Sequence, residues 1–253
     1  LAGLIVAADA ITDWCGWLLD EGYRGEMECI VAKIFGSEAQ KEAAIELFMK
    51  THGGRSFLEG HLFGDNVHDF LAPCIYEGEG EMLGMAFFKS LVKVHGMKFF
   101  EPIGKALAAN GIKTPNLLNP SHVMALMGPS LPYFSWKLKQ MIGGAQRAAI
   151  RLSDQKLSAH AQFAADQLQK SRLTVDKLMF KYKLTLPDRQ CAMAHLSQQI
   201  QDMIVMLVTA LYASRQDDEL VREAANTFCK DQKQKVLGKL PSADNFRATT
   251  KLG

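Results

Sequence analysis

The sequence lacks most of the patterns that identify a fold or a site directly. No stretch alternates apolar and polar residues as a strand does, and no segment repeats at a fixed period. The five cysteines show neither zinc-site spacing nor the density of a disulfide framework (Cys15, Cys29, Cys74, Cys191 and Cys229). We therefore expect a protein of a reducing compartment, cytoplasmic in location, with no metal site.

Membrane and targeting signals are also missing. No apolar run is as long as a typical membrane span, and the N-terminus has no basic region or cleavage site of a signal peptide. The chain opens at Leu1 directly in an apolar helical pattern, without a capping residue. We interpret this start as the interior of a helix, and we expect the chain to be the C-terminal part of a longer protein.

The chain is long enough for two domains, and its charge is unevenly divided. Of its 253 residues, 48% are hydrophobic and 22% charged, as in globular proteins. Residues 1–97 contain 7 Lys and Arg against 15 Asp and Glu, whereas residues 98–253 contain 22 against 12. A difference of this size predicts two units with different surroundings.

Positive charge is densest in residues 131–183, which contain ten Lys and Arg. Solvated helix faces explain such a region, and so does contact with an anionic membrane surface or an acidic partner. Aromatic residues beside Lys137 and Lys139 favour the membrane (Tyr133, Phe134 and Trp136). No nucleic-acid-binding pattern accompanies the charge, so we expect no nucleic acid partner.

Apolar residues recur at helical spacing along most of the chain, which predicts an all-α fold. The predicted helices cover residues 1–21, 26–50, 78–94, 97–110, 187–214 and 217–237. Residues 133–182 are predicted to form either two helices, 133–152 and 153–182, or one long kinked helix. We expect His95-Gly96 to end one helix, and the tail after Gly238 to be irregular. The proline-rich segment 113–132 predicts a linker with one short helix near residues 121–127. The predicted domains are therefore residues 1–112 and 133–253.

The stretch from His52 to Met82 interrupts the helices and is rich in glycine. It contains Glu77 within the sequence IYEGEG, between an aromatic residue and Gly78. A carboxylate that removes a proton from carbon must be partly desolvated, and Ile75 and Tyr76 could supply an apolar setting. The alternative is an ordinary acidic residue near a helix N-terminus, where the helix dipole favours it.

Two histidine-containing segments of this stretch are also candidates for a functional site. His52-Gly53-Gly54 is either a simple helix stop or a turn whose backbone N–H groups meet a phosphate or ribose. His61 and His68 lie near Asp65 and Asp69 without the spacing of a metal motif. We therefore predict no metal ligands here.

Taken together, His52–Met82 resembles the C-terminal signature of the acyl-CoA dehydrogenase family. In that family a Q-x-H-G-G-x-G turn ends one helix, and I-Y-E-G-T opens a later one. Here HGG, Asp69 and IYEG occur in that order at the family's distance. The resemblance implies that residues 1–112 are part of the family's C-terminal helical bundle. The second helical domain resembles that of the very-long-chain branch, where it supports dimerisation and membrane attachment.

The resemblance implies a function as well as a fold. Family members use FAD to oxidise acyl-CoA thioesters to trans-2-enoyl-CoA and pass electrons to an electron-transfer flavoprotein. By analogy Glu77 would be the catalytic base for the α-proton, with Tyr76 and Gly78 in the substrate site. The residues expected near FAD, commonly that of a neighbouring subunit, are His52, Gly53, Gly54 and Glu79.

Four positions depart from the family pattern. They are Lys50 in place of glutamine, Ser56 in place of glycine, His68 in place of arginine, and Glu79 in place of threonine. These changes leave a second hypothesis open, that of a non-catalytic helical module for interaction or membrane association derived from the same fold.

Overall fold

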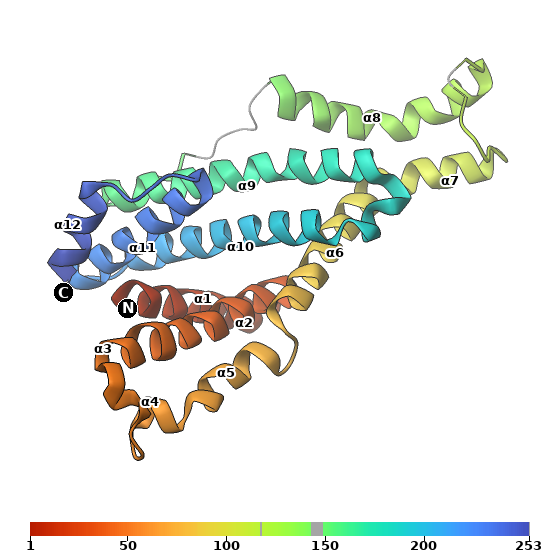
Figure 1. The fold of residues 1–253 in the computed structure, drawn as a ribbon. Helices are drawn as coiled ribbons and strands as arrows, with labels where there is room; N and C mark the ends of the chain where they lie inside the picture. Colours follow the sequence, from red (N-terminus) through yellow and green to blue (C-terminus); the bar gives the residue numbers. More distant parts are fainter. Residues whose placement is uncertain (117, 143–148, 253) are drawn as a thin grey trace. The chain divides into compact units, whose positions relative to one another are not determined.

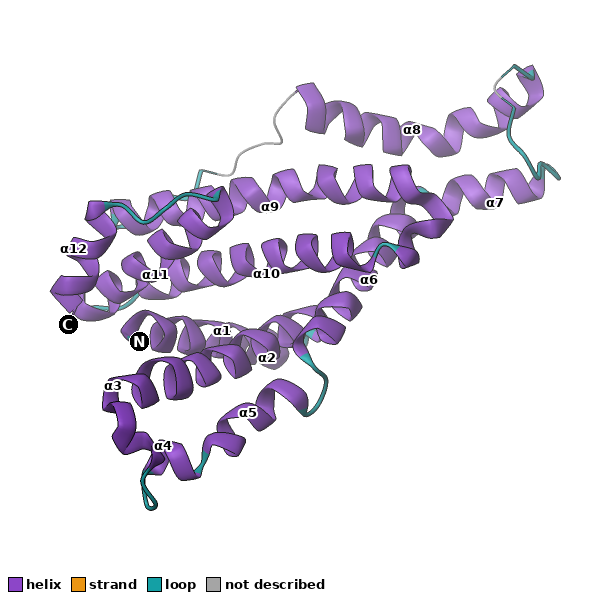
Figure 2. Ribbon diagram, in the orientation of Figure 1, coloured by secondary structure: helices purple, strands orange, loops and turns teal. Residues whose placement is uncertain are grey.

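The computed structural model of the chain describes residues 1–116, 118–142 and 149–252, and these are folded into helices without a strand (Figure 2). The predicted all-α fold is confirmed. The helices are α1 (Ala2–Asp20), α2 (Glu26–Lys41), α3 (Lys50–His52), α4 (Leu62–Asp65), α5 (Val67–Ile75), α6 (Gly80–Phe99), α7 (Glu101–Ala109), α8 (Pro120–Ile142), α9 (Gln155–Tyr182), α10 (Gln190–Ala213), α11 (Glu219–Leu237) and α12 (Ala243–Leu252).

The chain forms two compact units, and each draws on separate stretches of sequence. Unit 1 comprises residues 1–87, 149–168 and 190–253, and unit 2 comprises residues 88–148 and 169–189. Helices α6 and α9 therefore contribute residues to both units. These units follow contacts rather than the predicted division at residues 113–132, and that division stays a prediction.

Unit 1 is built from helices that pack closely along small side chains. Helix α1 contacts α2, α10 and α11, and α12 covers the end of α11 (Figure 1). A Cβ atom added at Gly3 would lie 3.0 Å from Phe228 Cβ, so α1 and α11 nearly touch there. Alanines fill much of the interior of this unit (Ala7, Ala10, Ala161, Ala164, Ala210, Ala213, Ala224 and Ala225). Removal of this apolar surface from water stabilises the unit.

Helix α1 corrects the prediction that no apolar run is long enough to span a membrane. By length and composition it could cross a membrane, although we expected no such run. It is the one helix of this kind among the residues that the structure describes. Core helices pass the same test, and α1 packs against three other helices of unit 1.

Helix α2 changes from α-helical to π-helical geometry before the glycine-rich stretch. Residues 42–49 continue α2 as a π-helical segment, and α3 adds one more turn that ends at His52. The predicted helix over residues 26–50 is thus confirmed in extent. Within the glycine-rich stretch, α5 begins after Asn66 without a side-chain cap bond.

Three predicted boundaries are wrong, and tertiary contacts explain each of them. Helix α6 passes through His95-Gly96 to Phe99, whose buried ring outweighs the roughly 1 kcal/mol cost of one glycine. The segment predicted as a linker is helical from Pro120, and α8 continues through two prolines because Tyr133 and Trp136 pack on Phe99. Residues expected to be an irregular tail form α12, which buries Ala248.

Candidate functional site

The HGG turn lies where α3 ends. His52 is the last residue of α3, and Gly53 adopts a left-handed φ of 59° that favours glycine. A Cβ atom added at Gly53 or Gly54 would meet nothing within 4 Å. The backbone of this turn is therefore open to an approaching group.

His52 is oriented by a second histidine. The Gly64 N–H donates to His61 Nδ1 at 3.2 Å, which leaves the proton of His61 on Nε2. His61 Nε2 lies 2.8 Å from His52 Nδ1 and donates to it. The rings of Phe48 and Phe63 stack beside this pair, with centroids 5.1 Å apart. Both nitrogens of His61 are thus engaged within the protein.

Two positions that differ from the family pattern have structural roles in this turn. The Ser56 hydroxyl is buried and donates to the Met49 carbonyl at 2.8 Å. Lys50 forms an ion pair with Glu46 on the exposed helix surface. A residue that the sequence reasoning missed is Gly64, where an added Cβ would lie 1.8 Å from the Ser56 carbonyl oxygen. The glycine there permits α4 to lie against the turn.

The second turn, from Tyr76 to Glu79, connects α5 to α6. Glu77 has a φ of 60°, which is rare outside glycine, and Gly78 has a φ of 110°. A Cβ atom at Gly78 would lie 2.8 Å from the Leu83 side chain. Glycine is therefore required at position 78 both by the backbone angle and by the space.

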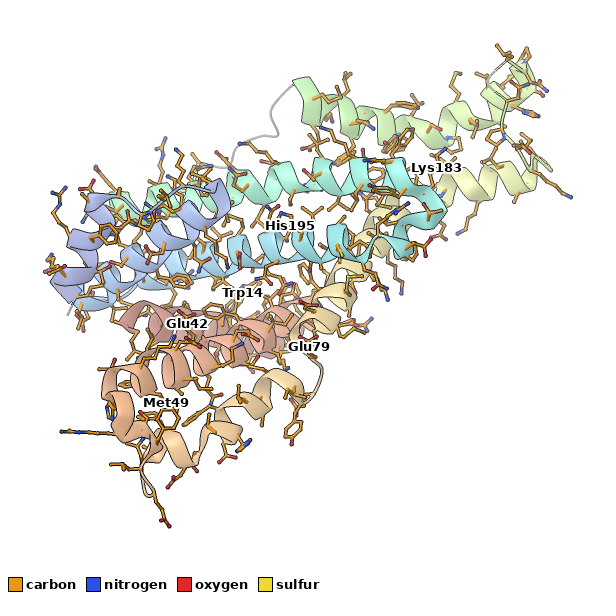
Figure 3. The ribbon with its side chains drawn as sticks, viewed as in Figure 1. Trp14, Glu42, Met49, Glu79, Lys183 and His195 are labelled. Atoms are coloured by element: carbon orange, nitrogen blue, oxygen red, sulfur yellow. The ribbon has the colours of Figure 1, made fainter. Side chains whose placement is uncertain are left out.

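Glu79 caps the helix that follows. Figure 3 labels Glu79 at the start of α6. Glu79 Oε2 accepts from the N–H groups of Glu81 and Met82, at 2.9 and 3.1 Å. These backbone bonds hold the pKa of Glu79 below its usual value. The carboxylate thus supplies the helix-capping bonds that a hydroxyl side chain also makes at this position.

An open groove of about 470 Å³ lies between α2 and α5, and Tyr76 and Glu77 line one end of it. Small residues of α2 create this space (Ala32, Gly36 and Ser37). The Lys33 ammonium, which also lines the groove, donates to the Gly78 carbonyl. The structure thus brings together the predicted base and a lysine 45 positions away that the sequence reasoning did not single out.

Comparison with protein families decides the identity of this part of the chain. The model of the family described as acyl-CoA dehydrogenase, C-terminal domain, matches residues 2–91. Residues 2–91 are thus similar to the acyl-CoA dehydrogenase C-terminal domain. The match includes both turns and the start of α6. Searches of curated proteins and of solved structures give no match.

Within this acyl-CoA dehydrogenase region, Glu77 is exposed, as are Ile75 and Tyr76 at 63% and 69% of their surfaces. The expectation that these two neighbours would desolvate Glu77 is wrong for the described residues. Burial of Glu77 would have to come from a bound substrate or from other protein surface. The roles predicted for His52, Gly53, Gly54, Tyr76, Glu77, Gly78 and Glu79 stay predictions.

The histidines and carboxylates of the stretch are engaged separately. Asp65 accepts from the Gly60 N–H at 2.7 Å, while His61 caps α4. Over residues 1–116, 118–142 and 149–252, no three His, Cys, Asp or Glu side chains gather as metal ligands would.

Proposed function

We propose that this chain is the C-terminal helical part of an FAD-dependent acyl-CoA dehydrogenase that converts long-chain acyl-CoA to trans-2-enoyl-CoA. The observation that supports this most is the position of Glu77. It lies in a left-handed turn at the end of the α2–α5 groove, inside the region that matches the family. Strained backbone at a single carboxylate beside a groove is typical of functional sites.

In this proposal Glu77 takes the α-proton of the acyl thioester. Its carboxylate must reach the α-carbon in a fixed orientation, because a positioned base accelerates proton transfer by about 10²–10⁴-fold. The turn supplies that orientation, since the two residues that follow Glu77, Gly78 and the capping residue Glu79, restrict the backbone. Tyr76 and Gly78 would flank the thioester, and the groove would receive part of the substrate.

The open backbone at Gly53 and Gly54 fits the predicted contact with FAD. Among the described residues no side chain occupies the space above either glycine, so a flat group can approach the backbone here, although one N–H of the turn already donates to the Lys50 carbonyl. His52 and Glu79 would complete this contact, in a homodimer with the FAD of the neighbouring subunit. When bound, FAD supplies the acceptor for the hydride of the β-carbon, and an electron-transfer flavoprotein would then receive the electrons.

The test of the catalytic role is Glu77→Gln in the flavin-loaded enzyme that contains this chain. We expect the rate of flavin reduction by acyl-CoA to fall by about 10²–10⁴-fold, with flavin content unchanged. Glu81→Gln is the matched control, because Glu81 is an exposed carboxylate that contributes only its backbone N–H to the turn. A near-normal rate for Glu77→Gln would refute the assignment, and a protein without flavin would favour the non-catalytic module.

A second function, peripheral contact of the cytoplasmic protein with a membrane, is favoured by helix α8. Exposed apolar residues follow each other at alternating spacings of three and four (Met124, Met127, Leu131, Phe134, Leu138 and Met141). The helix contains no acidic residue, and of its two lysines Lys139 is exposed while Lys137 pairs with Asp176. An exposed apolar stripe beside a lysine, on a helix without acidic residues, suits the surface of an anionic bilayer.

Cosedimentation with liposomes tests this contact. We expect binding to vesicles that contain anionic lipid, weakened by salt and lost when Met127 and Leu138 are both replaced by Glu. Leu240→Glu is the control, because this side chain is 89% exposed outside α8. Binding that ignores salt and lipid charge, or that survives the double substitution, would contradict the proposal.

A further inference from the structure

The left-handed conformation of Glu77 needs neighbours that hold it, because a residue with a side chain rarely adopts a φ of 60°. On the C-terminal side the turn is fixed by Glu79, which accepts the first N–H groups of α6. On the N-terminal side the Tyr76 N–H donates to the Ala72 carbonyl at 2.9 Å, at the end of α5. Neither bond holds the carbonyl group of Gly78, the residue between Glu77 and Glu79.

Helix α2 supplies the missing contact. Lys33 Nζ donates to the carbonyl oxygen of Gly78, the residue directly after Glu77. One helical turn further along α2, the Ser37 carbonyl accepts from Cys74 Sγ at 3.3 Å. Lys33 and Ser37 are four residues apart on one face of α2, and Cys74 and Gly78 are four residues apart across the turn. Helix α2 therefore holds the chain at two points that bracket Glu77.

The side chain of Lys33 is suited to this contact. It is half-buried, and its hydrogen bond to a carbonyl is charge-assisted and hence stronger than a neutral one. Its ammonium also contributes to the lowered pKa of Glu79, after the larger effect of the backbone bonds. Among the described residues that line the groove, Lys33 is the one cation, beside Asp69 and Glu77.

We propose that Lys33 is a positioning residue for the reaction, because its bond to the Gly78 carbonyl fixes the peptide that sets the direction of the Glu77 side chain. This inference rests on the proposed function of Glu77. It assigns Lys33 to the backbone of the turn and not to proton transfer, because the ammonium donates to the Gly78 carbonyl. A displacement of about 1 Å at a reacting group can cost about 10²-fold in rate, so a lost anchor has a measurable effect.

The experiment compares Lys33→Met, Lys33→Arg and Lys41→Met in the enzyme that contains this chain. Methionine keeps the length of the side chain without the donor, and arginine keeps the donor. Lys41 is the matched control, because it lies on the same helix but forms an ion pair with Glu38. We expect Lys33→Met to lower kcat by about 10- to 100-fold with KM for acyl-CoA and flavin content unchanged. Lys33→Arg should restore most of the rate.

Amide hydrogen exchange of residues 76–82, measured by mass spectrometry on the same preparations, separates this inference from the proposed function. We expect faster exchange in Lys33→Met than in the other two variants, whether or not the enzyme turns over. If the parent enzyme is inactive, the proposed function of Glu77 is refuted. Amide hydrogen exchange then still tests whether Lys33 holds the turn in place. Unchanged exchange, an unchanged kcat, or an equal loss in Lys41→Met would each overturn the role of Lys33.

Discussion

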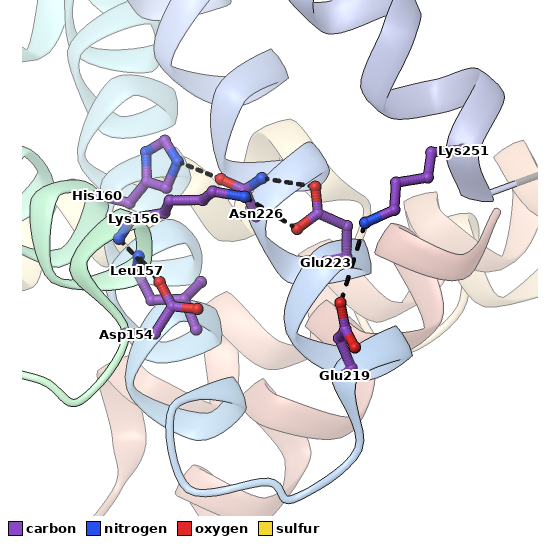
Figure 4. A network of polar contacts seen from close by, with 8 residues as sticks. All are labelled: Asp154, Lys156, Leu157, His160, Glu219, Glu223, Asn226 and Lys251. Atoms are coloured by element: carbon purple, nitrogen blue, oxygen red, sulfur yellow. Dashed lines mark hydrogen bonds and ion pairs between the residues drawn. The ribbon is translucent and has the colours of Figure 1, made fainter.

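The two units differ in the kind of polar group that they bury. In unit 1 a neutral pair is buried: His160 lies 3.1 Å from Asn226, and the Asn226 amide donates to Glu223, which also pairs with Lys156 at the surface (Figure 4). The surrounding helices pack through alanines. The charged groups of this network thus lie at its outer end.

In unit 2 a charge itself is buried. Asp176 of α9 is fully enclosed, and its carboxylate meets His95 Nε2 at 3.2 Å, Lys137 Nζ at 3.1 Å and the Tyr133 hydroxyl at 3.3 Å. The interior around it is aromatic rather than small-residue (Phe99, Phe100, Tyr133 and Trp136). The contrast teaches that unit 1 depends on close fit, whereas unit 2 depends on one carboxylate shared by α6 and α8.

The largest effect should come from removal of that carboxylate. Asp176→Ala leaves Lys137 and His95 without their buried partner, and loss of one member of a buried pair costs about 3–5 kcal/mol. The free energy of unfolding from denaturant titration measures this. Asp188→Asn, at an exposed position, is the control and should change little. A loss below about 1 kcal/mol for Asp176→Ala would show that the aromatic contacts alone hold unit 2.

A smaller loss should follow from overpacking in unit 1. The Cβ atom of Gly3→Ala would lie 3.1 Å from the Ala224 carbonyl oxygen, as well as close to Phe228. Such overpacking destabilises by about 1–3 kcal/mol. Gly16→Ala in the same helix meets nothing within 4 Å and should stabilise by up to about 1 kcal/mol. Equal effects of the two changes in thermal unfolding would contradict the close approach of α1 and α11.

The smallest effect should be a pH dependence that originates in the buried histidine of unit 1. Burial lowers the pKa of His160 from 6.5, and its Nδ1 has no hydrogen-bond partner among the described residues. The unfolded chain therefore binds the proton more readily than the folded chain, and stability is complete above pH 6.5 and falls as the pH drops toward the folded pKa. His160→Gln should flatten this slope as the pH falls below 6.5. His195→Gln, at an exposed position, should leave it intact.

The pH dependence expected for His160 also applies to His95 in unit 2, but the partner of His95, Asp176, reduces its size. Burial lowers the pKa of His95, while the bond to Asp176 opposes that shift. Loss of stability on acidification therefore has the same sign in both units. If His160→Gln removes the slope entirely, His95 contributes little and the carboxylate of Asp176 has offset its burial.

Much of the helical fold and both turns could be predicted from the sequence, because they depend on local chemistry. Periodicity predicts α1, α2, α10 and α11, and Gly238 ends α11 in the left-handed conformation as expected. The order of HGG and IYEG predicts the family, which the match to residues 2–91 confirms. These features need only neighbours within a few turns of the chain.

Other features of the fold and of the site were decided by tertiary structure alone, because they depend on contacts between residues that are distant in the sequence. In helix α1 the large apolar residues Ile5 and Leu19 are about half exposed, while Ala7 and Ala10 are buried. Nothing in the sequence links Lys33 to Gly78, or His95 to Asp176, because each pair meets only when helices pack. The sequence by itself determined where the chain turns and which carboxylate lies in the turn. Packing against α2 decided how that carboxylate is held, because a hydrogen bond across 45 residues has no local signal.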